Sequence, residues 1–461
     1  MSVRLADGRI LVAGGSQDGG PDGPLATAEI FDPAMGSFTA TGSMAEFRSQ
    51  AAATLLDDGS VLVVGGDTRG FGAPVATAET YHPPGRVFLP TGSMATGRSD
   101  FAAAKLADGR VLVAGGYNTA AGDELDSAEV YDPGSRKFTP TGAMNARRFG
   151  TTATLLPSGK VLVAGGFGPL RTALASAELY DPASGTFAPT GQMSTPRGAA
   201  TAAALPDGRV LVAGGDTGSG ANVTPTATAE IYDPNTGMFT PTGSMSGERA
   251  FATSTVLTTG EVLVAGSGGS AAAQTADVFD PSSGKFRSAG AMNAARASAV
   301  SAALPNGGAL VAGGIGPAPG YTRFATADVY PAPSSTSPVA PAPSPSASTP
   351  TADPPGIDEE VEDSPTAAVT VSVRARSGQS KLRVRIAPDL GPRKQWKFSI
   401  KEKKKGRKWA AVKKKGRVAV YRTKGVRHTR TIDLPKGRYK VKAKSAFGYR
   451  GATSRVVKLR R

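Results

Sequence analysis

The chain is poor in the residue types on which much protein chemistry depends. Its 461 residues include no cysteine, two histidines and two tryptophans. Without cysteine there is no disulfide framework and no thiolate nucleophile or metal ligand. The two histidines, His82 and His428, give few imidazole ligands for copper or zinc and few general bases for a serine nucleophile. No hydrophobic run reaches the ~18–20 residues that cross a bilayer, and no signal peptide follows Met1.

Glycine, in contrast, is abundant, with 59 residues, and much of it belongs to a repeat. Seven times a short apolar run ends in a glycine doublet, with Gly266-Ser267 as a degenerate copy. The spacing between successive doublets is 47 to 52 residues. A period near fifty predicts a radial array of small sheets, because one small sheet cannot bury its own apolar face. The doublets begin at Gly14, Gly65, Gly115, Gly165, Gly214, Gly266 and Gly313.

One copy of the repeat predicts four short strands. Residues 51–56, 61–64, 76–81 and 88–91 are the expected strands of the second copy. The second is a continuous Val and Leu run, which predicts burial on both faces, and we expect it to surround a central axis. Asp58-Gly59 predicts a tight hairpin whose residues need positive φ. Pro83 ends the third strand.

The repeats resemble kelch repeats. The resemblance rests on the glycine doublet, the later Ala-Glu-x-Tyr-Asp-Pro segment and an arginine that opens each copy, and it covers residues 1–331. It implies an all-β fold, a seven-bladed β-propeller with one four-stranded blade per copy. As in bacterial kelch proteins, phenylalanine fills the usual tryptophan position, at Phe38, Phe88, Phe138, Phe187, Phe239 and Phe286.

The first and last copies are incomplete. The first begins at Met1 with only residues 2–5 of its first strand, and the seventh stops after Tyr330 without a fourth strand. Propellers commonly close by pairing strands from the two ends of the chain, and that closing strand is missing here. We expect the natural start to lie upstream and to carry a Phe/Trp-x-x-Thr-Gly-x-Met segment. The alternative is a seven-bladed ring with one frayed blade.

A Pro-, Ser- and Thr-rich segment follows the repeats at residues 332–365. This composition predicts a disordered, extended linker, which ends in an acidic run at residues 358–363. Linkers of this kind are common in exported bacterial proteins, and they favour an extracellular or cell-surface location.

Residues 366–461 predict a second, strongly basic β domain. They contain 32 lysines and arginines against three acidic residues, while the whole chain carries a formal charge of +16. Residues 381–386 and 438–444 alternate apolar and basic side chains, and Trp396 and Trp409 are expected in the core. We expect a small immunoglobulin- or fibronectin-like β-sandwich.

The motifs Lys436-Gly437-Arg438-Tyr439 and Phe447-Gly448-Tyr449-Arg450-Gly451 resemble basic β domains of exported actinobacterial proteins. The charge predicts an anionic envelope polymer as partner, with nucleic acid disfavoured because alternation places the aromatic residues in the core. A solvated cationic face without a partner is the alternative.

Enzyme chemistry of the galactose oxidase type is excluded by composition. Galactose oxidase also has a kelch propeller, and the resemblance implies a copper site with imidazoles, tyrosines and a Cys–Tyr thioether. This chain has no cysteine, so we expect no metal, no cofactor and no catalytic residue. Most propeller acids occupy one fixed position per copy, which favours a structural role. They are Glu29, Glu79, Glu129, Glu178, Glu230, Asp277 and Asp328.

The arginine that opens each copy has two possible roles. It follows the methionine of Gly-x-Met by four residues, in the connection between copies, on the face that carries the variable loops. Kelch adaptor domains bind acidic ligands with arginines at this position, so the resemblance implies a binding role. The alternative is an ion pair with the acid of its own blade. The six are Arg48, Arg98, Arg148, Arg197, Arg249 and Arg296.

Loop residues that differ between copies are the better candidates for specificity. They are Asp67, Arg69, Phe71, Tyr117, Asn118, Phe167, Arg171, Asp216, Tyr321 and Arg323. Together these features predict a non-catalytic binding protein of the cell envelope or extracellular space. Its propeller loops would bind a protein or polysaccharide. The alternative is a carbohydrate-active enzyme with carboxylates on propeller loops.

Overall fold

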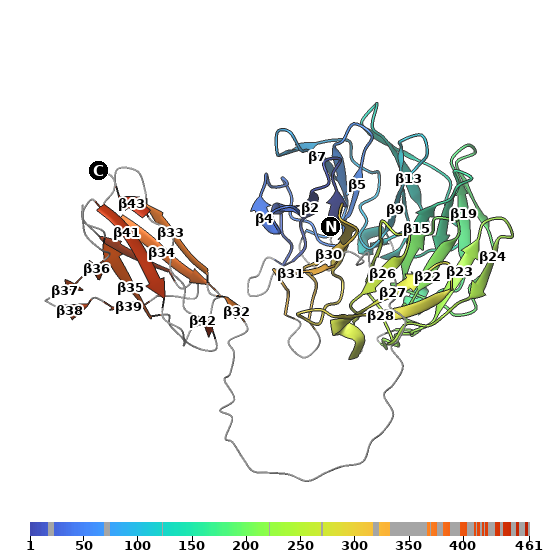
Figure 1. The fold of residues 1–461 in the computed structure, drawn as a ribbon. Helices are drawn as coiled ribbons and strands as arrows, with labels where there is room; N and C mark the ends of the chain where they lie inside the picture. The colour runs from blue at the N-terminus through green and yellow to red at the C-terminus, as the bar shows by residue number, and fades with distance from the viewer. Residues whose placement is uncertain are drawn as a thin grey trace, which may run out of the picture. The chain divides into compact units, whose positions relative to one another are not determined.

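The chain divides into two units, Met1–Ala340 and Pro341–Arg461, in the computed structural model (Figure 1). The structure describes residues 1–16, 23–68, 74–121, 123–220, 222–268, 271–316 and 322–331, and the strands between residues 367 and 459. Helix in these residues is limited to three short 3-10 turns, Thr119–Ala121, Pro169–Arg171 and Ala271–Gln274. The described chain is therefore all-β, as predicted. None of its helices is long and apolar enough to cross a membrane.

The first unit is a propeller of seven blades, each an antiparallel sheet whose strands follow chain order. Blade 1 holds β1 (Ser2–Arg4), β2 (Ile10–Ala13), β3 (Ala28–Asp32) and β4 (Ser37–Ala40). Blade 2 holds β5 (Ala52–Leu55), β6 (Val61–Val64), β7 (Ala78–His82) and β8 (Val87–Pro90). Blade 3 holds β9 (Ala102–Lys105), β10 (Val111–Ala114), β13 (Ala128–Asp132) and β14 (Lys137–Pro140). Blade 4 holds β15 (Thr152–Leu155), β16 (Val161–Ala164), β19 (Ala177–Asp181) and β20 (Thr186–Pro189).

The remaining blades repeat this order. Blade 5 holds β21 (Thr201–Ala204), β22 (Val210–Ala213), β23 (Ala229–Asp233) and β24 (Met238–Pro241). Blade 6 holds β25 (Thr253–Val256), β26 (Val262–Ala265), β27 (Thr275–Asp280) and β28 (Lys285–Ala291), and blade 7 holds β29 (Val300–Ala303), β30 (Ala309–Ala312) and β31 (Ala327–Tyr330). Two small ribbons rise from blades 3 and 4, β11 (Tyr117–Asn118) with β12 (Asp123–Glu124) and β17 (Phe167–Gly168) with β18 (Thr172–Ala173).

The first strand of each blade lies innermost. β1, β5, β9, β15, β21, β25 and β29 contact one another in that order, and β29 contacts β1. The expectation that the second strand surrounds the axis is therefore wrong, although the second strands of blades 2 to 7 are fully buried, as predicted. The physical reason is side-chain size. The first strands are rich in Ala, Ser and Thr, so seven of them can converge around a channel, where one cavity measures about 400 Å³.

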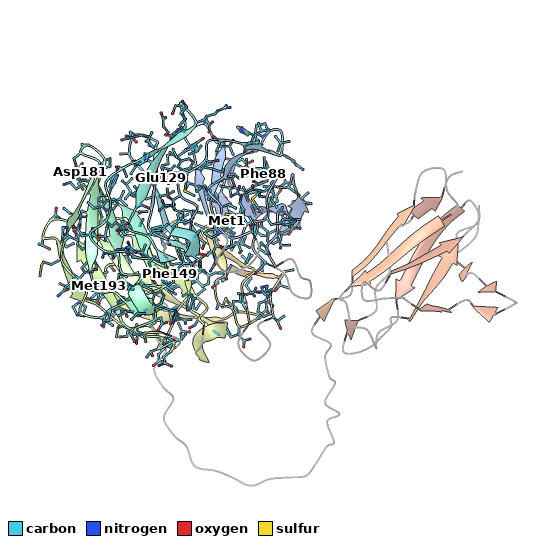
Figure 2. All side chains as sticks on the ribbon, turned by 180° about the vertical axis from the view of Figure 1, so that it is seen from behind. Met1, Phe88, Glu129, Phe149, Asp181 and Met193 are labelled. Atoms are coloured by element: carbon cyan, nitrogen blue, oxygen red, sulfur yellow. The ribbon has the colours of Figure 1, made fainter. Side chains whose placement is uncertain are left out.

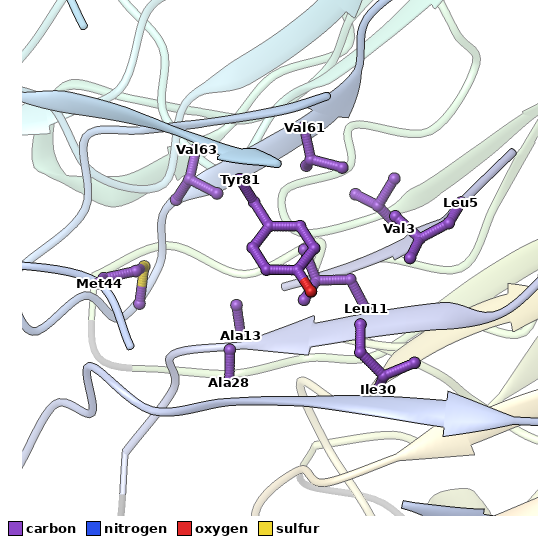
Figure 3. Packing of buried hydrophobic residues seen from close by; sticks show 10 residues of the cluster. All are labelled: Val3, Leu5, Leu11, Ala13, Ala28, Ile30, Met44, Val61, Val63 and Tyr81. Carbon is purple, nitrogen blue, oxygen red and sulfur yellow. The ribbon is translucent and has the colours of Figure 1, made fainter. Parts of the chain in front are cut away.

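Valine and leucine of the second strands instead fill the spaces between blades. Between blades 1 and 2, for example, Leu11 of β2 packs with Val61 and Val63 of β6, and Tyr81 of β7 joins them (Figure 3). Met44, from the connection between the two blades, completes this cluster. Full burial of each Val or Leu contributes about 1.5–3 kcal/mol, so the interfaces between sheets carry the stability of the ring.

The Asp-Gly hairpins are one residue longer than expected. Leu56 N–H donates to the Ser60 carbonyl, and the three residues between them form the loop. Of these, Gly59 has positive φ, at +80°, whereas Asp58 accepts hydrogen bonds from the Ser60 N–H and hydroxyl. The expectation that Asp58 and Gly59 both need positive φ is wrong. A three-residue turn requires positive φ only at its last position, which is Gly59.

Blade 7 has three strands within residues 271–316 and 322–331, and it closes the ring by packing against blade 1. Ile10 and Phe31 of blade 1 form a core with Leu304, Leu310 and Ala312 of blade 7. In Figure 1 the gold β30 and β31 accordingly return beside the blue β2. Among the described residues, blades 7 and 1 meet through side-chain packing, and no strand is shared between them.

The second unit also consists of strands. One sheet contains β33 (Thr370–Ala375), β34 (Lys381–Ala387) and β40 (Thr429–Asp433), and another contains β36 (Ala410–Ala411), β35 (Lys397–Glu402), β41 (Gly437–Ala443) and β43 (Val457–Leu459). β39 (Val420–Arg422) pairs with β35. The remaining pairs are β32 (Ala367–Ala368) with β42 (Tyr449–Arg450) and β37 (Lys413–Lys414) with β38 (Arg417–Val418). Residues 381–386 lie in β34 and residues 438–443 lie in β41, as the alternating pattern predicted. The sandwich, its core and the boundaries of the linker stay predictions.

Candidate functional site

The six arginines that open the repeats are buried, each with a relative exposure of 0%. Arg148 is typical. It donates from Nη1 to the carbonyls of Gly165 (2.8 Å) and Ser176 (3.1 Å), and from Nη2 to Glu178 Oε1 (2.8 Å). Burial lowers the pKa of the Arg148 guanidinium, and the charge of Glu178 opposes that shift. Glycine, serine and glutamate of the following blade thus surround the guanidinium.

The acids that pair with five of the six arginines also hold the connection between blades. Glu178 Oε2 accepts from the N–H of Asn145 (2.7 Å), a residue of the same connection as Arg148. Glu79, Glu129, Glu230 and Asp328 accept from the connections before them in the same way. We call each set of methionine, arginine and paired acid a clip. This geometry favours the structural alternative for the arginines, because their guanidinium groups present no surface to a ligand.

A ring of backbone hydrogen bonds lies where the connections enter the innermost strands. Its members lie two residues after each arginine and all have φ between +47° and +57°. From Asp100 to Ser298, each N–H donates to the carbonyl of the member in the preceding blade, over 2.7 to 3.2 Å, which makes five bonds among the six residues. We call this the mouth ring, because each member directly precedes an innermost strand. It consists of Gln50, Asp100, Gly150, Ala199, Phe251 and Ser298.

The mouth ring was not expected from the sequence, although its fixed offset from the arginine is a signal that could have located it. The side chains differ in every blade, as they do in the variable loops. Connections and loops also lie together, since Ser99 pairs with Tyr117 and Phe149 with Phe167 through isolated β-bridges. They therefore share one face of the propeller, which we call the loop face, as predicted.

Asp100 is the member of the mouth ring with an altered pKa. It is partly buried, and its Oδ2 accepts a hydrogen bond from Gln50 Nε2 at 2.9 Å. Burial raises the pKa of Asp100 to about 6, and the charge of Asp67 adds to the shift. Asp67 itself is buried at 1% exposure. Two carboxylates thus lie near each other where blades 2 and 3 meet at the mouth.

Aromatic and charged residues of blades 3, 4 and 5 meet beside the mouth ring. The ring centroids of Tyr117 and Phe149 are 5.5 Å apart, and those of Phe149 and Phe167 are 5.3 Å apart. The Arg171 guanidinium lies 4.4 Å from the Phe167 centroid and pairs with Asp216 Oδ2 at 3.0 Å. We call these five residues the rim cluster. Figure 2 shows Phe149 toward the middle of the propeller, whereas Asp181 of an outer turn lies at its edge.

Leu170 projects from the rim cluster. Its relative exposure is 88%, the largest among the exposed large hydrophobic residues of the described chain. Both Leu170 and Arg171 have positive φ, at +58° and +53°, a conformation that costs a non-glycine residue about 1–2 kcal/mol. Gly220 stabilises this backbone conformation. Its N–H donates to the Leu170 carbonyl (3.2 Å), and its carbonyl accepts from Arg171 Nη1 (2.8 Å). Strained backbone that the surroundings hold in place is typical of functional loops.

The other predicted loop residues are separate from this cluster. Asn118 is buried and donates from Nδ2 to the Gly97 carbonyl at 2.6 Å. Arg323 is exposed and donates to Ser16 Oγ at 2.7 Å. Arg69, Phe71 and Tyr321 lie outside the described residues. Of the ten candidates, the structure therefore brings Tyr117, Phe167, Arg171 and Asp216 together, and Phe149 and Leu170 are functional candidates that the sequence did not indicate.

The donors of the propeller do not fit a copper site of the galactose oxidase kind. His82, the propeller histidine, lies at the end of β7, where its Nε2 shares a hydrogen bond with Thr80 Oγ1 at 2.9 Å. Cysteine is absent from the sequence. In the described part of the chain no three His, Cys, Asp or Glu side chains lie together as metal ligands would. We therefore derive no chemical step through copper.

Comparison with known proteins supports the fold. Residues 101–145 match the family of the kelch motif. The chain is similar to the solved structure of a fungal alcohol oxidase of the AA5 family in complex with copper, with a TM-score of 0.59 and 15% identity. That similarity covers 99% of this chain and 96% of the oxidase chain. At this identity it shows the propeller fold alone. No curated protein matches the sequence.

Proposed function

We propose that this protein is a non-catalytic binding protein and that its propeller binds a partner through the loop face. The observation that carries the proposal is the exposed Leu170, whose backbone is held beside the rim cluster by a hydrogen bond from Gly220. Binding costs less conformational entropy when the backbone of the contacting segment is ordered beforehand. The kelch motif is also commonly associated with protein binding. Leu170 is the proposed apolar anchor, and the partly exposed Tyr117 and Phe149 extend the surface around it.

A protein partner fits the apolar tip best, and a polysaccharide would instead stack on Tyr117 and Phe149. The Pro/Ser/Thr-rich segment supports an extracellular or cell-surface location. The charge of residues 366–461, with 32 basic and three acidic residues, supports a tether to an anionic envelope polymer. The propeller and the tail would then bind different partners.

The test compares two exposed leucines. We expect Leu170→Asp to abolish retention of a partner from a cell-envelope extract, because it places a charge on the proposed anchor. Leu89→Asp, on outer strand β8, is the matched control, since Leu89 is 48% exposed. Both variants should keep the melting temperature of the parent protein. Equal retention by both variants contradicts the proposed site.

A second candidate function is supported by Asp100 and Asp67. Burial raises the pKa of the Asp100 carboxyl to about 6, and a carboxyl group with a raised pKa is what a general acid in glycoside hydrolysis needs. We expect Asp100→Asn to leave the partner retention by Leu170 intact. Release of sugar from envelope polysaccharide that disappears in Asp100→Asn would instead favour the enzyme.

A further inference from the structure

The two units place charged residues opposite each other in different ways. In the described strands of the propeller no like charges lie directly opposite across paired strands, and Asp132 lies opposite Lys137. In the strands of the second unit, five pairs place one cation directly opposite another. One pair, Lys381 with Asp433, combines opposite charges. The five cation pairs are Arg374 with Arg383, Lys397 with Arg422, Lys401 with Lys440, Lys414 with Arg417 and Arg438 with Lys458.

Cations that lie directly opposite each other weaken a sheet. Opposite residues of antiparallel strands have Cβ atoms about 4.5–5.5 Å apart, and like charges at this separation are destabilising. Lysine and arginine stay charged at neutral pH, so the repulsion persists unless an anion lies beside the pair. The second unit therefore gains stability from an anion that its paired strands bind.

Three of the five cation pairs share one face of one sheet. Side chains alternate between the two faces along a strand, and residues directly opposite each other lie on the same face. By register, the face that contains Lys401 and Lys440 holds seven cations and, among the paired positions, no acidic residue. We call it the cationic face. Its cations are Lys397, Lys401, Arg422, Arg438, Lys440, Lys442 and Lys458.

The cationic face differs from the other faces of the two larger sheets of this unit. The aromatic residues Phe398, Tyr421 and Tyr439 lie on the reverse face of the same sheet. In the sheet of β33, β34 and β40, the face that contains Arg385 holds four cations together with Asp433. Among the paired positions, the cationic face thus combines the most positive charge with the absence of an aromatic residue.

A linear phosphate polymer fits the cationic face best. Five of its seven cations are lysines, which bind phosphate as point charges without a fixed orientation. Seven cations on adjacent strands match an anion that repeats along a chain, because the first contact raises the effective concentration of the next phosphate. Nucleic acid also repeats phosphate, but its bases stack on aromatic residues, and the register places none on this face.

We infer that the cationic face is a binding site for a linear phosphate polymer and that the bound polymer stabilises the second unit. The inference rests on the proposed tether of residues 366–461 to an anionic envelope polymer, and it adds the face that binds and the chemistry of the polymer. Binding and stability are linked, because a ligand that binds only the folded state shifts the folding equilibrium toward that state.

The test uses the full chain and inorganic polyphosphate, and it compares two charge reversals. Lys401→Glu places an acid opposite Lys440 on the cationic face. Arg385→Glu is the matched control, because it makes the same charge change on the other sheet, opposite Ser372 and Thr429. By titration calorimetry at several salt concentrations, we expect Lys401→Glu to weaken binding about tenfold and to lower the salt slope by about one. Arg385→Glu should weaken binding by less than about threefold, because salt screens a charge that does not contact the polymer.

Hydrogen exchange tests the stabilisation. Polyphosphate should slow the exchange of amides in β35 and β41 of the parent chain and leave those of β10 in the propeller unchanged. Without polyphosphate, Lys401→Glu should by itself slow exchange in β35 and β41, because it replaces a cation pair by a pair of opposite charges. Lys440→Glu makes the same replacement from the other strand and should act alike, so the result does not depend on the folding of one variant.

Four results would contradict the inference. No binding of polyphosphate at about 50 mM salt, where phosphate contacts are strongest, would overturn the tether and the cationic face together. Equal weakening by Lys401→Glu and Arg385→Glu would keep the tether and overturn the cationic face as its site. Unchanged exchange in β35 and β41 on binding would overturn the stabilisation. Tighter binding of single-stranded DNA with the same number of phosphates would overturn the class of polymer.

Discussion

Single residues carry the junctions between blades. Arg148 has no exposed surface, and Glu178 is 2% exposed. The two buried charges pair with each other. A buried pair of this kind adds little net stability by itself, because desolvation offsets the attraction. Its importance lies in the cost of breaking it, and in the backbone hydrogen bonds that Arg148 donates and Glu178 accepts.

We expect Arg148→Ala to lower the free energy of unfolding by about 3–5 kcal/mol, because it leaves the Glu178 carboxylate buried without its cation. Arg147→Ala is the control, since the side chain of Arg147 is 53% exposed and lies 3.7 Å from Asp126. It should change stability by at most about 1 kcal/mol. Urea unfolding measures both, and equal effects would contradict the structural role of the clip.

Asp100 predicts a dependence of stability on pH. Its pKa is about 6 in the folded protein against 3.8 as the ordinary value, so between pH 4 and 6 the folded state keeps a proton that the unfolded chain has lost. The contribution of this group to stability is therefore complete below pH 4 and is lost as the pH rises through 6.

Asp100→Asn removes this titration. Relative to the parent, the variant should gain about 1–2 kcal/mol between pH 4 and pH 7, less than the full shift implies because Asp100 is partly exposed. Urea unfolding of both proteins at several pH values measures the difference. A difference that stays constant over this range would mean that Asp100 titrates at its ordinary pKa.

At the scale of the element, the glycine doublet ends each second strand where the next connection crosses it. Gly165 has φ of +65°, and a Cβ there would lie 2.4 Å from the Arg197 carbonyl. The strand ends in glycine for two reasons, since both its own backbone conformation and the approach of a neighbouring segment exclude a side chain.

Two glycine variants distinguish the cost of the backbone conformation from the cost of the clash with the neighbouring connection. Gly36→Ala, where φ is +60° and nothing lies within 4 Å, should cost about 1–2 kcal/mol for the conformation alone. Gly165→Ala should cost about 3–5 kcal/mol, because the Arg197 connection must also move. Thermal unfolding followed by circular dichroism compares them, and similar melting temperatures would show that the connection yields without cost.

At the scale of the whole molecule, the charges are separated along the sequence. Residues 366–461 carry 32 basic and three acidic residues, so the rest of the chain is acidic overall. The Met1–Ala340 unit has cores between its own blades. Binding of an anionic partner by residues 366–461 and binding of a partner by the loop face should therefore be separable by truncation of the chain.

We expect the full chain to bind heparin or teichoic acid with an affinity that falls steeply between about 50 and 200 mM salt, because lysines and arginines release counterions on binding. A chain ending at Ala340 should not bind. Replacing the acidic residues within 358–363 by their amides should tighten binding, if they mask the basic surface. Affinity that ignores salt would leave the cationic face without a polymer partner.

Repetition made much of the fold predictable. The spacing of the doublets indicated seven blades, and the Val and Leu runs such as residues 61–64 indicated buried second strands, because both depend on local patterns that recur in every copy. For the arginines, the sequence left two possible roles open, a binding role and an ion pair with the acid of the same blade. The burial of the arginines favours the ion pair. That burial depends on how the junction between blades packs and not on the residue type.

The sequence by itself determined the blades, since alternation, turn residues and apolar runs act over a few neighbouring residues. Only the tertiary structure decided which strand lies innermost, because this depends on how seven sheets share the space around one axis. It also decided which residues meet on the loop face. The mouth ring joins residues about fifty positions apart, and Tyr117, Phe149, Phe167 and Asp216 come from three blades. The contacts of the rim cluster leave no periodic trace in the sequence, so they follow from the closed ring and from nothing local.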